Sequence, residues 1–289
     1  MSRLTNPEPV RMQCMELWGG NQATNKSFSA PGLDLFVYSE PYQASEIGGG
    51  DLYYLTSCAS GRITRLLLAD VIGHGEAVSD IALALRDLLR DNVNKISQQS
   101  FIQGMNREFG KVSEENRFAT AVVATFFEPK QRLTLGVAGH PNPIYYRASK
   151  NKWVDLDAGK VDRARPGNLP LGVIEDSAYP SRAIQVEPGD RFLLYSDALI
   201  ESRTGDQQML GTDGIIRILQ EMPESPPETI IPHLVETIQQ YAAGNLEQDD
   251  TTIVLGQFTT TRVGLKDNLL APFRLFRKAR DKTTVACKI

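Results

Sequence analysis

The chain has 289 residues, of which 41% are hydrophobic and 23% are charged, and its formal net charge is -4. This composition is typical of a folded protein and excludes a fibrous or largely disordered chain. Charges interrupt the apolar runs before they reach the roughly 18 to 20 residues that a membrane helix needs. The first residues also lack a signal-peptide pattern. We therefore expect a cytoplasmic protein.

Charge is distributed unevenly along the chain. Residues 262–289 carry eight Lys or Arg and two acids, which leaves 23 basic and 33 acidic residues in 1–261. An acidic body argues against nucleic acid as a partner, because phosphate backbones are bound by Lys and Arg. The cysteines, Cys14, Cys58 and Cys287, are widely spaced and lack a C-x-x-C pair. Neither a disulfide framework nor a zinc site is predicted.

The first predicted elements follow a mixed segment, residues 1–32, to which we assign a packing or partner role. Alternation predicts a strand over 33–39, and two apolar runs, 52–55 and 63–68, predict a hairpin. Such a hairpin brings Asp51 and Asp70 to one end of a sheet. Apolar residues at helical spacing then predict helices over 76–93 and 99–112.

The rest of the body also alternates strands with a pair of helices. Further strands are predicted over 118–127, 133–137, 144–147, 179–186, 190–195 and 251–258. Helices are predicted over 214–222 and 227–242, and a surface loop over 157–172. Hairpin-connected strands interrupted by two pairs of helices predict an α+β fold, in which helices cover the outer faces of antiparallel sheets.

Acidic residues stand at the ends of several predicted strands, at Asp51, Asp70, Asp197, Asp249 and Asp250. One such acid is usually a solvated turn residue, but the set lies beside clustered glycines. Carboxylates without a matching His or Cys set favour hard cations, so Mg²⁺ or Mn²⁺ is expected rather than zinc. Two such ions can activate a shared water for attack on phosphorus.

Six short blocks resemble the metal-dependent serine/threonine phosphatases of the PPM (type 2C) class, in the bacterial branch of the sporulation stage II E phosphatase and RsbU. In order, they are GGDLY at 49–53, ADVIGHG at 69–75, AGHP at 138–141, LPLG at 169–172, YSD at 195–197 and DDTT at 249–252. Each block alone is a weak signal. Six in the same order within residues 33–258 are specific.

The resemblance implies the architecture of the chain. It implies a four-layer αββα sandwich, two antiparallel sheets flanked by helix pairs, over a phosphatase domain at 33–258. Residues 1–32 are then an N-terminal segment, and 259–289 are a basic C-terminal tail.

The resemblance also implies a centre that holds two Mn²⁺ or Mg²⁺ ions. Its metal set is Asp51, Asp70, the backbone carbonyl of Val71, Asp197, Asp249 and Asp250. Asp51 and Asp70 are the catalytic pair that flanks both ions, and Asp250 is expected to support Asp249. A metal-bridging hydroxide would attack the phosphorus of phosphoserine or phosphothreonine directly.

Three positions depart from the branch pattern, at Tyr54, Ile72 and Ala198. An alanine after Asp197 does not favour a left-handed turn, so the loop there is expected to differ. Three histidines have more ordinary interpretations than catalysis: His74 at a helix start, His140 in a turn and His233 within a helix.

The function expected from the resemblance is a phosphoprotein phosphatase of bacterial partner-switching signalling, acting on a substrate such as an anti-sigma-factor antagonist. One alternative is a catalytically silent module that binds a phosphorylated regulator. Another is a metallohydrolase of small phosphate esters. The basic tail, with Leu269, Leu270, Phe273 and Phe276, could touch a membrane, but a solvated or self-packed tail is favoured. Control by a partner or by a homodimer contact is a further hypothesis.

Overall fold

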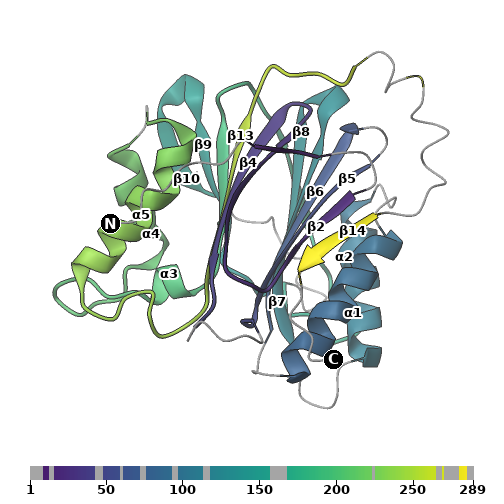
Figure 1. Cartoon of the computed structure of the whole chain (residues 1–289), viewed down its shortest axis with the longest axis horizontal. Coiled ribbons are helices and arrows are strands. Elements are labelled where there is room, and N and C mark those ends of the chain that lie inside the picture. Colours follow the sequence, from purple (N-terminus) through teal and green to yellow (C-terminus); the bar gives the residue numbers. More distant parts are fainter. Residues whose placement is uncertain are drawn as a thin grey trace.

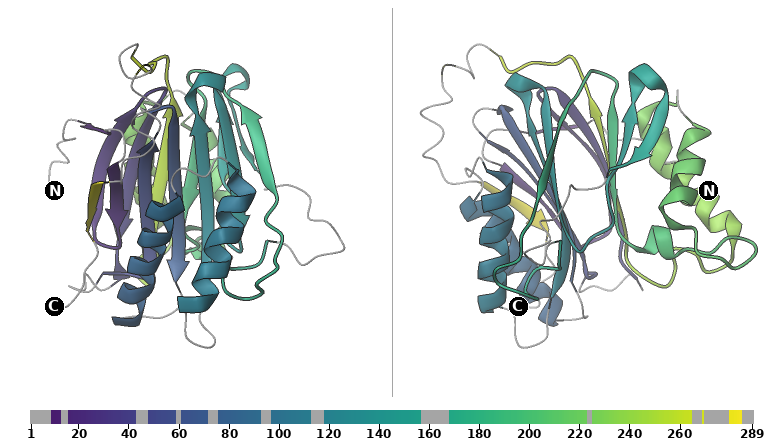
Figure 2. Two further views of the ribbon diagram at one scale, coloured as in Figure 1. Left: turned by 90° about the vertical axis from the view of Figure 1, so that its right-hand side faces the viewer. Right: turned by 180° about the vertical axis from the view of Figure 1, so that it is seen from behind.

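The computed structural model describes residues 9–12, 16–42, 48–58, 61–71, 76–92, 97–112, 118–156, 168–222, 225–264, 269 and 280–284. In this part of the chain, two seven-stranded sheets pack face to face, with helices on both outer surfaces (Figure 1). The reverse view in Figure 2 shows the same four layers. The predicted α+β class and αββα layering are confirmed.

The first sheet has the strand order β1-β3-β4-β13-β12-β9-β10. In that order its strands are Val10–Arg11, Thr24–Ala30, Leu33–Glu40, Thr251–Phe258, Arg191–Tyr195, Ile144–Arg147 and Lys152–Asp155. All neighbours are antiparallel except β1 and β3. The β10 strand was not predicted, and it forms a short hairpin with β9.

The second sheet has the order β11-β8-β7-β6-β5-β2-β14. In that order its strands are Ser181–Gln185, Arg132–Ala138, Ala119–Phe127, Ile63–Val71, Asp51–Cys58, Glu16–Gly20 and Arg280–Thr284. Its neighbours are antiparallel except β14 and β2. The expectation of purely antiparallel sheets is thus corrected at one edge of each sheet. Parallel pairing requires a long connection, which these terminal strands have.

Both ends of the chain contribute to the sheets. Strands β2 and β3 lie before residue 33, where we predicted the domain to begin, and they are hydrogen-bonded into different sheets. Near the other end, β14 lies beside β2, with Thr284 opposite Gly20. Leu269 is exposed, whereas Leu270, Phe273 and Phe276 lie outside the described residues.

Two long helices cover the outer face of the second sheet, as Figure 2 shows from the side. They are α1, Glu76–Asn92, and α2, Gln98–Val112. Buried Leu85, Leu89 and Phe101 pack against the outward-facing side chains of β5, β6 and β7. Both predicted helices are confirmed. No helix in the described ranges is long and apolar enough to cross a membrane.

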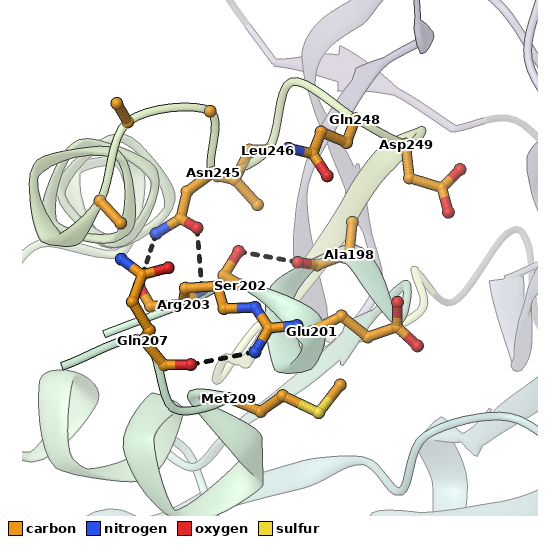
Figure 3. Close-up of a pocket in the computed structure, with 13 residues that line it drawn as sticks. Ala198, Glu201, Ser202, Arg203, Gln207, Met209, Asn245, Leu246, Gln248 and Asp249 are labelled. Carbon is orange, nitrogen blue, oxygen red and sulfur yellow. Dashed lines mark hydrogen bonds between the residues drawn. The ribbon is translucent and has the colours of Figure 1, made fainter. Parts of the chain in front are cut away.

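Within the described ranges, the first sheet is covered by α3 at Ala198–Glu201, α4 at Gly211–Gln220 and α5 at Pro227–Tyr241. The two longer helices were predicted and bury Ile215, Leu219 and Leu234 against the sheet. The short α3 was not predicted, because four residues cannot show a helical period. A hollow lies beside α3 (Figure 3).

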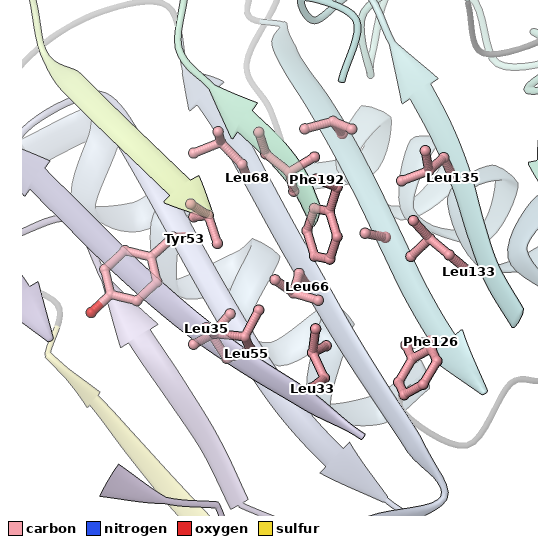
Figure 4. Packing of buried hydrophobic residues seen from close by; sticks show 14 of the residues in the cluster. Leu33, Leu35, Tyr53, Leu55, Leu66, Leu68, Phe126, Leu133, Leu135 and Phe192 are labelled. Atoms are coloured by element: carbon pink, nitrogen blue, oxygen red, sulfur yellow. The ribbon is translucent and has the colours of Figure 1, made fainter. Parts of the chain in front are cut away.

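The main core lies between the two sheets (Figure 4). Alternate residues of facing strands point inward, among them Leu33 and Leu35 of β4 and Leu66 and Leu68 of β6. Burying each such side chain stabilises the fold by about 1.5–3 kcal/mol. This packing fixes the strand ends where the predicted acids lie.

Candidate metal centre

Asp51 and Asp70 lie directly opposite each other across β5 and β6. Asp51 is the first residue of β5, and Asp70 is the last residue but one of β6. Both therefore lie at the same end of the second sheet. The predicted hairpin and its placement of the two acids are confirmed.

The Asp51 side chain is poorly solvated. The residue is 4% exposed, and its Oδ2 atom has no hydrogen-bond partner. Burial, followed by the charges of Asp70 and Asp250, raises the pKa of Asp51 well above its usual value, against the hydroxyls of Ser196 and Thr252. A buried carboxylate beside like charges is costly. A cation at this position would offset that cost.

Burial and acids from distant parts of the sequence raise the pKa of Asp70. Burial, followed by the charges of Asp197, Asp249, Asp250 and Glu201, raises its pKa to about 7. Burial also raises the pKa of Asp197, with Asp249 and Glu201 contributing. The structure thus brings the predicted aspartates into one electrostatic group.

Glu201 belongs to this group but was not predicted. It is the last residue of α3, and its backbone N–H donates to the Asp197 carbonyl at 3.0 Å. The two acids are four positions apart, which places them on the same side of a helical turn. A prediction of α3 from the sequence would have placed Glu201 on the same side of the helical turn as Asp197.

The Asp250 carboxylate binds backbone amides. Its Oδ1 accepts from the N–H of Tyr42 at 2.6 Å, and its Oδ2 accepts from the N–H groups of Gly50 and Asp51. A side chain on Gly49 would overlap this carboxylate. The carboxylate thus supports the loop before Asp51, whereas it is the backbone N–H of Asp250 that donates to the Oδ1 of Asp249, at 2.8 Å. The expected support of Asp249 and the membership of Asp250 in the metal set stay predictions.

The glycine loop before Asp51 is also held from the other side. Asn21 accepts a hydrogen bond from the Gly49 N–H at 2.9 Å and donates one from its side chain to the Gly49 carbonyl at 3.1 Å. A Cβ on Gly50 would lie 2.9 Å from the Val71 carbonyl oxygen. Glycine therefore lets this carbonyl approach the loop. The role of Asn21 was missed, because its partner is 28 positions away.

The remaining sequence blocks meet at the same end. The Ser196 N–H donates to the Thr252 carbonyl, and the Thr252 N–H donates to the Ser196 hydroxyl, both at 2.9 Å. These bonds join the YSD and DDTT blocks. Leu171, of the LPLG block, pairs with Ala119 at the start of β7. The next residue, Thr120, is opposite Asp70.

His140 has a structural environment. It is buried, and its Nδ1 lies 2.8 Å from the Thr120 hydroxyl. Burial lowers the pKa of His140 to about 3, which keeps the imidazole neutral. His233 is exposed on α5. His74 and Ile72 lie outside the described residues.

The other two departures from the branch pattern have local structural explanations. Tyr54 is buried against α1, and its hydroxyl donates to the Ala82 carbonyl at 2.8 Å. Ala198 begins α3 directly after Asp197. The chain thus continues as a helix where the family's glycine would favour a turn.

The donor chemistry of this end fits a hard cation. It offers carboxylates, one of them with an unpartnered buried oxygen, and a backbone carbonyl, which are the ligands that Mg²⁺ and Mn²⁺ prefer. Among the residues that the structure describes, no three His, Cys, Asp or Glu side chains already form a metal-binding group. The individual ligands therefore stay predictions.

The αββα sandwich matches the fold of solved PP2C phosphatase domains. The chain belongs to the family of stage II sporulation protein E (SpoIIE), whose family model matches residues 60–259.

Known relatives agree with this assignment. The phosphoserine phosphatase RsbU of Bacillus subtilis is 24% identical over 225 residues, which cover 77% of this chain and 63% of RsbU. The chain therefore spans less than two thirds of the length of that relative. The PP2C phosphatase domain of SpoIIE from Bacillus subtilis, with a fragment of its regulatory domain, superposes with a TM-score of 0.62 at 15% identity, over 86% of this chain and 64% of that one. RsbX in complex with magnesium superposes with a TM-score of 0.59 at 16% identity, over 82% of this chain and all of RsbX.

Proposed function

We propose that this protein is a Mn²⁺- or Mg²⁺-dependent phosphatase that hydrolyses phosphoserine or phosphothreonine on a protein substrate. The observation that carries the proposal is the pairing of Asp51 with Asp70 at one sheet end, within a group that includes Asp197 and Asp249. The SpoIIE family and the phosphoserine phosphatase RsbU support it.

In this proposal Asp51, Asp70, the Val71 carbonyl, Asp197 and Asp249 hold two ions. When bound, such ions supply positive charge and lower the pKa of a coordinated water. The protein's own part is to fix these oxygens in place. Asp250 holds the loop before Asp51, and the Ser196–Thr252 bonds tie together the chain segments next to Asp197 and Asp249.

The substrate expected from the family resemblance is a phosphorylated signalling protein, such as an anti-sigma-factor antagonist. The magnesium complex of RsbX supports the choice of metal. A homodimer and a cytoplasmic location also stay predictions.

The proposal is tested by measuring phosphate release from a phosphoserine peptide with Mn²⁺ and with EDTA, for the wild type and Asp70→Asn. Asp176→Asn is the control, because Asp176 is an exposed acid of a surface loop. We expect Mn²⁺-dependent release by the wild type and the control, and a loss of at least about a hundredfold in Asp70→Asn, since losing one well-placed interaction costs about 2.7 kcal/mol or more.

Other outcomes would support other functions. Peptide binding without hydrolysis would indicate a silent binding module. Hydrolysis of p-nitrophenyl phosphate but of no phosphopeptide would indicate a small-ester hydrolase. Equal activity of wild type and Asp70→Asn would contradict the assigned centre.

A further inference from the structure

A hollow of about 270 Å³ opens beside the acid group (Figure 3). One wall comes from α3 and the loop that follows it, and the other comes from residues 242–249. The charges of two of its lining residues, Glu201 and Asp249, also raise the pKa of Asp70. A peptide bound with its phosphate at the acids would therefore have this hollow next to it.

The two walls are tied together by a buried asparagine. The Asn245 side chain accepts from the Arg203 N–H and donates to the carbonyls of Arg203 and Ile238, each at 2.8 Å. Asn245 is 6% exposed. Its amide thus makes three hydrogen bonds that hold the end of α5, the following loop and the segment after α3.

Backbone geometry also indicates a fixed shape. Leu246 and Gln207, one on each wall, have φ values of 61° and 65°. Left-handed backbone is uncommon for residues other than glycine, and it persists where surrounding contacts determine it. The hollow is therefore formed before any ligand binds.

Arg203 supplies the cation of the hollow. Its Nη1 donates to the Gln207 carbonyl at 2.9 Å (Figure 3). No acidic side chain in the described part of the chain forms an ion pair with Arg203. The rest of the guanidinium can therefore bind a carboxylate, which matches its planar donor geometry. Met209, 56% exposed, adds apolar surface to the same wall.

We propose that this hollow is a substrate subsite, in which Arg203 pairs with an acidic side chain close in sequence to the phosphorylated residue. The inference rests on the proposed phosphatase function and names its substrate class, a phosphopeptide with an acidic flank. Glu201 and Asp249 also line the hollow and oppose an acidic ligand, so its binding depends on the pairing with Arg203.

The test compares three substrates: a phosphoserine peptide with Asp on both sides, the same peptide with Ala in those places, and p-nitrophenyl phosphate. Each is assayed with Mn²⁺ for the wild type, Arg203→Ala and Arg203→Glu. Arg217→Glu, at an exposed position of α4, is the control for net charge.

We expect Arg203→Ala to lower kcat/KM about tenfold for the acidic peptide, mainly by raising KM, and Arg203→Glu to lower it further. The Ala peptide and p-nitrophenyl phosphate should change less than about twofold, the usual size of a surface effect. Equal losses on all three substrates, or none, would overturn the subsite.

Failure of the phosphatase proposal would be visible separately, as no hydrolysis of any substrate by the wild type. In that case, fluorescence anisotropy measures binding of the labelled acidic phosphopeptide to the wild type and Arg203→Glu. Weaker binding to Arg203→Glu than to the wild type would support the subsite, and equal binding would reject it.

Discussion

Asp51 faces Asp70 across β5 and β6, so two carboxylates occupy directly opposed positions of an antiparallel pair. Like charges in such positions destabilise a sheet. Both carboxyl groups are also buried, and burial disfavours their charged form. The pair therefore reduces the stability of the metal-free protein, which leads to the first prediction.

Asp70→Asn should make the metal-free protein more stable at alkaline pH. The pKa of Asp70 is raised from 3.8 to about 7 by burial and neighbouring acids, so the folded state binds this proton more tightly than the unfolded state does. The stability contributed by the protonated acid is complete below the unfolded pKa and is lost as pH rises through about 7. Asparagine cannot ionise and removes this loss.

Urea unfolding in EDTA at about pH 4 and about pH 8 measures the difference. The gain from Asp70→Asn should be present at the higher pH and nearly absent at the lower one. Asp176→Asn should show no such dependence. A gain of the same size at both pH values would mean that Asp70 is not held with a raised pKa.

Asp250→Ala should destabilise the protein by about 1–3 kcal/mol, because the N–H groups of Tyr42, Gly50 and Asp51 lose their acceptor. Asp250→Asn keeps one acceptor oxygen and should lose less. Chemical denaturation in EDTA measures both changes without the contribution of a metal. If both variants were as stable as the wild type, these bonds would not hold the glycine loop.

Gly49→Ala should impair Mn²⁺-dependent activity, because the added methyl group would overlap the Asp250 carboxylate. Gly110→Ala is the matched control. It lies in α2 with no atom within 4 Å of the added carbon, and it should stabilise the helix by roughly 0.5–1 kcal/mol. Thermal unfolding and phosphate release compare the two variants. Full activity in Gly49→Ala would show that the loop can shift without harm.

The sequence predicted most of the sheets and helices because their side chains repeat with a clear period. It also predicted the place of Asp51 and Asp70, since a hairpin fixes which ends meet. It did not predict α3, which is too short to show a helical period, or β10, whose two apolar residues are adjacent and do not alternate. Nor did it predict β14, whose five residues are all polar and show no apolar alternation. The role of Glu201 depends on α3, and that of Asn21 depends on a contact 28 positions away.

Asn21 provides the last prediction. Its backbone and its side chain both bind Gly49, whose neighbour Gly50 donates to Asp250. Asn21→Ala removes the side-chain bond and should shift the loop that starts at Gly48. We expect kcat to fall about tenfold or more, since small displacements of positioned groups are costly, and we expect a higher Mn²⁺ concentration for half-maximal activity.

Gln98→Ala is the matched control for this variant. Gln98 is a buried amide that bonds to the Val123 carbonyl and the Thr125 hydroxyl within the second sheet, away from the strand ends that carry the acids. It should lower stability by a similar amount, about 1–3 kcal/mol, and leave the Mn²⁺ requirement unchanged. Asn21→Asp should not restore activity, because a carboxylate cannot donate to the Gly49 carbonyl. An unchanged Mn²⁺ requirement in Asn21→Ala would limit Asn21 to a structural role.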